Sequence, residues 1–193
     1  MRHTSYNKLR DDLNSGDLVA FGGTGIISGL IKLGTHSVVS HVGVVFDTKP
    51  LVGGDFIVQI IESTSLGDGF AGVQINRMST RVAQYKGDIW VLKMKEATRE
   101  IFNEEKFLRW CLDQKGAPYD APGALQAGLD HLFPDTDEDF SRLYCSELTS
   151  GGLQVSGALP TTVNASEETP IDQCKRPIWE EPVQIKGKIK EIF

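Results

Sequence analysis

Short runs of apolar, β-branched residues separated by glycine-containing turns fill much of the first half of the chain. Runs of this kind predict β-strands. Val38 to Phe46 is the clearest run, and Phe56 to Glu62 is apolar on both faces, which predicts a central strand. The other expected strands are Asp17 to Phe21, Val73 to Arg77, Asp88 to Met94 and, near the end of the chain, Pro182 to Ile185.

The hydrophobic pattern becomes helical between about Thr98 and Gln114, and Gly116 supplies a natural stop. A short helix or turn is expected at Ile26 to Leu33, and a short helix at Gly123 to Phe133. The acidic run that follows, 135–139, predicts a solvated loop. Strands early in the chain and helices in the middle predict one α+β domain.

Charge and composition narrow the classes of partner. The 20 basic residues are outnumbered by 26 acidic ones, giving a net charge of −6, and no basic cluster with interleaved aromatic residues occurs. Nucleic acid is therefore not an expected partner. No stretch is long and apolar enough to predict a membrane span. The first residues lack the apolar core of a signal peptide, so we expect a cytoplasmic location, with delivery by another export route left open.

The three cysteines are an odd number and include no C-x-x-C pair, so neither a disulfide framework nor a structural zinc site is expected. Cys111 lies on the apolar face of the expected helix, and Cys174 is by default a packed residue. Cys145 differs because it stands among polar residues in the segment LYCSEL. A cysteine in the first turn of a helix meets unpaired N–H groups that stabilise a thiolate and can also bind an oxyanion.

His41 and Glu62 are the candidate partners of this cysteine. His41 lies in the strongest predicted strand, and Gly43 on the same strand face leaves space beside the imidazole. Glu62 ends an apolar strand, where a buried carboxylate needs a partner. By themselves, each also fits an ordinary role: a packed histidine, and a solvated carboxylate at a strand end.

At these residues the chain resembles a known group. GDLVAF followed by SHVGVVF is similar to the core of the NlpC-like cysteine peptidases. YCSEL follows these strands instead of preceding them, which resembles the circularly permuted branch of that papain-fold superfamily. GAPYD at 116–120 and TPID at 169–172 resemble two further elements of the group, so the resemblance extends from Gly16 to Asp172.

The resemblance implies a single permuted papain-like domain over residues 1–193, with its core at about 16–172 and a C-terminal strand to about 186. An antiparallel sheet or small barrel with helices packed on it is expected. Cys145 would be the nucleophile, His41 its base and Glu62 the acid that orients the imidazole. Tyr119, Tyr144 and Ser40 are candidates for contacting the substrate or the oxyanion. Neither a metal nor a cofactor is expected.

The implied activity is hydrolysis of an amide bond, peptide or isopeptide, through a thioester acyl-enzyme, so a peptide, protein or small acyl substrate is the expected partner. Two alternatives stay open. Permuted relatives similar to lecithin–retinol acyltransferase use the same chemistry for acyl transfer or for lipid and ester hydrolysis. A catalytically silent binding module could also retain the cleft.

Overall fold

The computed structural model describes residues 2–24, 28, 32–33, 35–51, 56–64, 70–118 and 144–193. The helix expected at Gly123 to Phe133, the acidic run 135–139 and Tyr119 lie outside these ranges, as does most of the helix or turn expected at Ile26 to Leu33. Among the described residues, no helix is long and apolar enough to cross a membrane.

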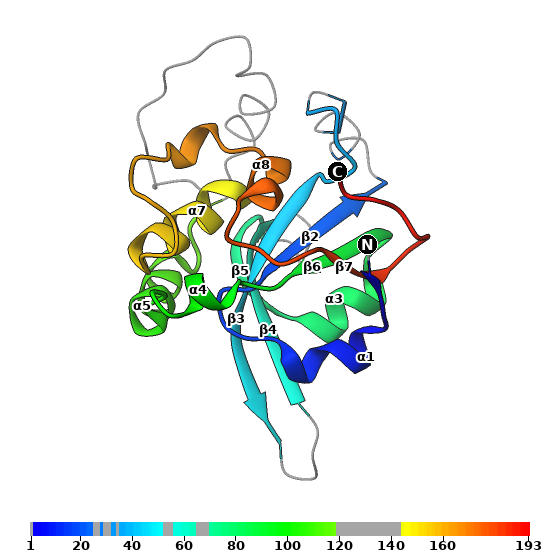
Figure 1. Cartoon of the computed structure of the whole chain (residues 1–193), viewed down its shortest axis with the longest axis horizontal. Helices are drawn as coiled ribbons and strands as arrows, with labels where there is room; N and C mark the ends of the chain where they lie inside the picture. The colour runs from blue at the N-terminus through cyan, green and yellow to red at the C-terminus, as the bar shows by residue number, and fades with distance from the viewer. Residues whose placement is uncertain are drawn as a thin grey trace.

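A seven-stranded sheet in the order β1-β7-β6-β2-β3-β4-β5 forms the centre of the fold (Figure 1). The strands are β1 (Arg2–His3), β2 (Leu18–Gly23), β3 (His41–Pro50), β4 (Phe56–Thr64), β5 (Gly72–Arg77), β6 (Gly87–Leu92) and β7 (Val183–Lys186). Neighbouring strands are antiparallel except for β1 and β7, which are parallel. The α+β class is confirmed, but the expected antiparallel sheet or small barrel is corrected to a mixed sheet that stays open in the described part of the chain.

The six strands expected from the sequence are all found, with shifted ends. The largest shift is at β3, which begins at His41 and not at Val38. The residue before it, Ser40, still donates its N–H to the Phe21 carbonyl at 2.9 Å. Further along, a bulge between Val45 and Asp47 changes the register of β3 against β4. His41 is therefore the first residue of a long strand, at the end of the sheet where β2 stops.

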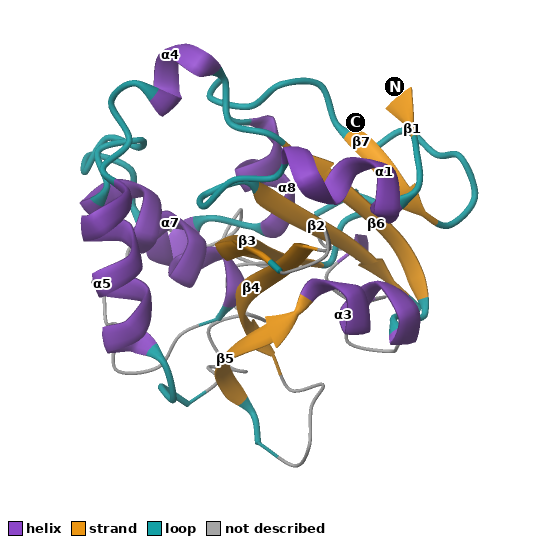
Figure 2. Cartoon of the chain, turned by 90° about the horizontal axis from the view of Figure 1, so that it is seen from below, coloured by secondary structure: helices purple, strands orange, loops and turns teal. Residues whose placement is uncertain are grey.

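Helices cover both faces of the sheet (Figures 1 and 2). On one face lie α1 (Tyr6–Leu9), which continues into a 3₁₀ turn (Arg10–Asp12), and α3 (Met78–Gln84). On the other lie α5 (Glu104–Gln114), α7 (Cys145–Val155) and α8 (Pro170–Lys175). Further helical elements of the described residues are α4 (Glu96–Arg99) and a 3₁₀ turn (Ala165–Glu167).

Some of these helices differ from the sequence prediction. The single helix expected at Thr98 to Gln114 is divided into α4 and α5, because Asn103 caps α5 by accepting the Lys106 N–H at 2.9 Å. Neither α3 nor α8 was predicted. α8 begins with the TPID segment, in which Thr169 is the cap and Pro170 the first helical residue.

Strand alternation divides the core into layers. On β2, Val19 and Phe21 face α1 and α3, whereas Leu18 and Ala20 face the side of α7 and α8. Val44, Ile61 and other residues of the second face pack against α5 and α7. The two helical layers therefore meet the same strands from opposite sides.

A buried aspartate joins the start of β2 to the α4 region. Asp17 is fully buried and accepts hydrogen bonds from the Met94 and Asn14 N–H groups, both at 2.9 Å. Arg99 of α4 also donates a hydrogen bond from Nη2 to the Asp17 carboxylate, at 2.5 Å. The guanidinium carbon of Arg99 lies 5.4 Å from the centre of the Phe102 ring. The Gly-Asp pair recognised in the sequence thus serves the fold.

Two glycines bring α7 close to α5. A methyl group built on Gly151 would lie 2.5 Å from Cζ2 of Trp110, and one on Gly152 would lie 3.0 Å from the buried Phe107 ring. Real side-chain carbons essentially never approach within 3.0 Å, so α7 needs glycine at 151 to sit this close to Trp110. A side chain at 152 would require the Phe107 ring to shift by a few tenths of an ångström. α7 in turn carries Cys145, so this contact helps to position the first turn of the helix.

Gly151→Val should therefore lower the free energy of unfolding by about 1–3 kcal/mol, since the new side chain must push Trp110 and α5 away. Chemical denaturation followed by circular dichroism measures this. Val155→Ala on the same helix, at a position 39% exposed, is the control and should change stability by no more than about 0.5 kcal/mol. A Gly151→Val protein as stable as the wild type would show that the two helices are not held so close.

Candidate active site

Cys145 is the first residue of α7, as the sequence predicted. Tyr144 precedes it with an extended backbone, and the Tyr144 N–H donates to the Glu147 carboxylate at 3.3 Å. Cys145 therefore sits at the positive end of the α7 helix dipole. This position favours a thiolate over a thiol.

The start of β3 meets this helix end. The His41 ring and the Val42 backbone lie close enough to the Cys145 sulfur to lower the pKa of its thiol. Cys145 as a residue is only 4% exposed, while 14% of the His41 side chain remains exposed. A nucleophilic atom and a potential base are therefore in direct contact at a site that retains an opening to solvent.

Glu62 lies on β4, the strand next to His41, and its side chain is completely buried. His41 Nε2 is 2.8 Å from Glu62 Oε2. Arg81 Nε donates to Oε1 at 2.6 Å and Arg81 Nη2 to Oε2 at 3.0 Å, and Asn76 Nδ2 donates to Oε1 at 3.0 Å. Each carboxylate oxygen thus has two partners, which is what a buried carboxylate requires.

Cys145, His41 and Glu62 shift one another's pKa values. Burial would lower the pKa of His41, but the charge and hydrogen bond of Cys145, together with Glu62, outweigh it and raise the pKa to about 9. Burial would raise the pKa of Glu62, but His41 and Arg81 lower it to about 2. Burial would also raise the pKa of Cys145, yet His41 and the Val42 backbone lower it. The arrangement favours a thiolate–imidazolium pair oriented by an ionised carboxylate.

The other two cysteines have the opposite environment. Cys111 on α5 and Cys174 on α8 are both buried, and burial raises the pKa of each thiol well above its usual range. Neither has a histidine among the groups that shift it. Both match the packed role expected for them, and their thiols are poor nucleophiles.

Gly43 has a different use from the one expected. The sequence suggested that it leaves space for a substrate atom beside His41. In the structure a methyl group at this position would lie 3.1 Å from the Glu62 Cβ and 3.1 Å from the Ile61 carbonyl oxygen. Gly43 thus admits the close approach of β4 and its carboxylate, and the space beside it is filled by protein.

Ser40 and Tyr144, two of the candidates for contacting the substrate or the oxyanion, use their hydroxyls in contacts with the backbone. The buried Ser40 hydroxyl accepts the Gly23 N–H at 3.1 Å and faces the Phe21 carbonyl at 3.4 Å, so it ties the end of β2 to the start of β3. The Tyr144 hydroxyl is hydrogen-bonded to the Ser166 carbonyl. Both hydroxyls thus hold backbone segments together in this structure. Tyr119 lies outside the described residues.

Arg81 and Asn76 are the site residues that sequence reasoning missed. Arg81 comes from α3, a short helix with no clear apolar periodicity, and Asn76 from the edge strand β5. A signal was present in the apolar strand itself, because a buried Glu62 demands a cation as well as a histidine. Nothing local in the sequence indicates which of the nearby arginines supplies it.

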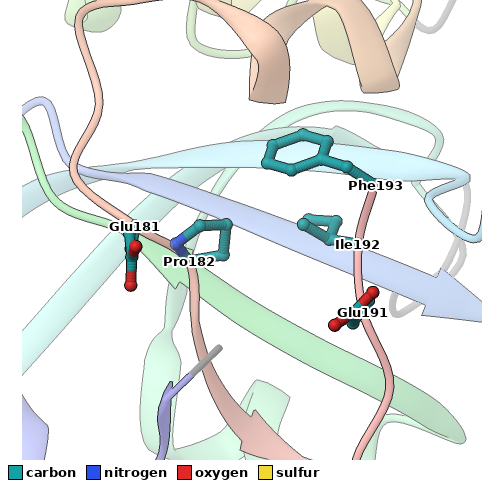
Figure 3. Close-up of a pocket in the computed structure, with 5 residues that line it drawn as sticks. All are labelled: Glu181, Pro182, Glu191, Ile192 and Phe193. Atoms are coloured by element: carbon teal, nitrogen blue, oxygen red, sulfur yellow. The ribbon is translucent and has the colours of Figure 1, made fainter.

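The pocket drawn in Figure 3 lies elsewhere, at the end of the chain. It has a volume of about 310 Å³ and is lined by Glu181, Pro182, Glu191, Ile192 and Phe193. These five residues include no cysteine and no histidine. The chemistry described above thus has no counterpart there.

The lowered pKa of Glu62 leads to a prediction about the stability of the protein in acid. A carboxyl group whose folded pKa is about 2, against an ordinary value of 4.5, stabilises the fold above pH 4.5, and that contribution is lost as the pH falls toward 2. Stability should therefore rise with pH across this window, and the Glu62→Gln protein should show a smaller rise than the wild type. Denaturant unfolding at a series of pH values measures both slopes. Equal slopes would mean that Glu62 is not held ionised in the folded protein.

Comparisons with known proteins add information about the fold alone. No protein-family model and no curated protein sequence matches the chain. Among solved structures, the fold is similar to that of the metalloprotein yiiX from Escherichia coli O157:H7, described as DUF1105. The match has a TM-score of 0.50 and 18% sequence identity and covers 88% of this chain and 87% of that one. The chain therefore shares an overall architecture with that protein.

Proposed function

We propose that this protein is a cysteine hydrolase of the permuted papain-like type, cleaving an amide bond in a peptide, a protein isopeptide or a small acyl substrate. The observation that carries the proposal is the chain of contacts from the Cys145 sulfur to the His41 ring and on to the buried Glu62 carboxylate, 2.8 Å from that ring. A nucleophile, a base and an orienting acid in this order form the constellation of a catalytic triad.

The chemistry follows from the charge states. The Cys145 thiolate attacks the carbonyl carbon of the scissile amide, and the negative charge moves to the carbonyl oxygen. The N–H groups at the start of α7 stabilise that oxyanion. The His41 imidazolium then gives its proton to the departing amine, and the C–N bond breaks to leave a thioester on Cys145. Water, deprotonated by His41, attacks the thioester and releases the carboxylic acid and the thiolate.

The protonation states support this sequence of steps. With the Cys145 pKa lowered and the His41 pKa raised to about 9, the pair is shifted toward the thiolate and the imidazolium. The base is therefore already protonated when it must act as an acid toward the leaving amine. Glu62 keeps the imidazole in one orientation and stabilises its positive charge.

Selective alkylation tests the reactivity of the thiol without any knowledge of the substrate. At about pH 6.5, iodoacetamide should modify Cys145 at least about tenfold faster than Cys111 or Cys174, since only Cys145 has a lowered pKa. Peptide mapping by mass spectrometry gives the three rates. Similar rates at all three cysteines, or Cys145 modified last, would overturn the proposed function.

Substitutions test the separate roles of Cys145, His41 and Glu62. Cys145→Ala and His41→Ala should each abolish hydrolysis, whereas Glu62→Gln should leave measurable activity, because an amide can still orient the imidazole but cannot stabilise its charge. The assay is product release from a panel of peptide, isopeptide and ester substrates, read by mass spectrometry.

Cys111→Ala is the matched control, since it removes a buried thiol outside the site, and it should retain activity. The double variant Cys145→Ala/Glu62→Gln should be no worse than Cys145→Ala. Hydrolysis that survives Cys145→Ala would contradict the assignment of the nucleophile, and full activity in Glu62→Gln would make that residue structural.

A further inference from the structure

The Glu62 carboxylate is shared between two cations. His41 contacts one oxygen, while the Arg81 guanidinium spans both, at 2.6 and 3.0 Å. The Arg81 contact is the bidentate geometry that makes arginine–carboxylate pairs strong and directional. The Glu62 side chain is fully buried and the Arg81 side chain is 11% exposed, so solvent screens this pair little.

Two aromatic rings hold the guanidinium in place. The Arg81 guanidinium carbon lies 5.2 Å from the centre of the Phe21 ring and 5.4 Å from that of Tyr85. Phe21 also packs against the His41 ring, with the ring centres 5.2 Å apart. The base and the guanidinium therefore share an aromatic neighbour as well as a carboxylate, and neither can move without disturbing the other.

The sum of the buried charges at the site indicates what Arg81 contributes. With the thiol and the imidazole both neutral, the buried charges are Glu62⁻ and Arg81⁺, which cancel. After the proton passes from Cys145 to His41, the thiolate and the imidazolium cancel as well. Without Arg81, both states would carry an uncompensated negative charge, and each proton of the coupled Cys145–His41 pair would be harder to remove.

We propose that Arg81 is a positioning residue of this site: it fixes Glu62 against His41 and supplies the positive charge that allows the buried thiolate–imidazolium pair to form near neutral pH. The inference rests on the proposed function of Cys145 and adds to it a fourth group that acts through Glu62. Among the described residues, β3 and the residue before it, β4, β5, α3, the turn after α3 and α7 supply the charged, titratable or hydrogen-bonding groups that face this cluster. They are Ser40, His41, Glu62, Asn76, Arg81, Tyr85, Cys145 and Ser146.

The experiment is the pH dependence of Cys145 alkylation by iodoacetamide, which needs no substrate. In Arg81→Met the midpoint of the rate profile should move to higher pH by about one unit, equivalent to about tenfold slower alkylation at a pH below both midpoints. Arg81→Lys keeps the charge but loses the bidentate contact, so its midpoint should stay near that of the wild type. A merely structural arginine would alter the unfolding transition of these variants and leave the midpoint in place.

Two further variants complete the design. Arg99→Met is the matched control, because Arg99 also pairs with a buried carboxylate and lies near an aromatic ring. Its partner Asp17 precedes β2, whereas His41 pairs with Phe21, further along that strand. Arg99→Met should lower stability without moving the midpoint. Glu62→Gln/Arg81→Met removes both charges together and should bring the midpoint back toward the wild-type value. The double variant also serves if Arg81→Met alone fails to fold, since it leaves no unpaired buried charge.

The outcomes separate the two proposals. A wild-type Cys145 that titrates like an ordinary thiol would overturn the proposed function itself. A reactive wild-type Cys145 whose midpoint is the same in Arg81→Met would overturn the role of Arg81 and leave the nucleophile standing. The role of Arg81 would also be overturned if the midpoint of Glu62→Gln/Arg81→Met lay a full unit from the wild-type midpoint. Charge balance could not then explain the shift in Arg81→Met.

Discussion

The burial of one carboxylate is the constraint on which the other features of the site depend. Removing an ion from water costs on the order of several kcal/mol even after relaxation, so Glu62 can be buried only if its oxygens are fully paired. The structure meets this requirement from three directions, with His41 on β3, Asn76 on β5 and Arg81 on α3. The positions of the edge strand and of α3 are therefore tied to the same atoms that orient the base.

The site draws its side chains from helices on both faces of the sheet. The thiol belongs to α7 and clusters with Val42 and Ala20 on one face of the sheet, whereas Arg81 belongs to α3 on the other face. A sheet normally separates its two faces, and contact between them is easiest where strands end. Because His41 is the first residue of β3, its ring can reach both the α7 thiol and the Glu62 carboxylate.

How much the sequence could predict depended on whether the signal was local. The strands were predicted from their apolar runs. Cys145, His41 and Glu62 were selected as polar residues at a helix start, within an apolar strand and at a strand end. The backbone contacts of the Ser40 and Tyr144 hydroxyls could not be predicted, because adjacency along the chain does not fix where a side chain points when the backbone enters a new element. Arg81 was missed because its partner is brought to it by the pairing of β4 with β5 and by the turn into α3, which no local pattern encodes.

The sheet order has a consequence for the sequence of events during synthesis. The strands β6, β2, β3, β4 and β5 are neighbours in space and come from one continuous stretch, residues 18–92, which also includes His41, Glu62 and Arg81. Cys145 leaves the ribosome well after this stretch. Under the proposed function, the base and its charge-balancing partners are therefore made before the nucleophile. The thiolate–imidazolium pair can then form only in the last steps of folding, when α7 docks on the strands.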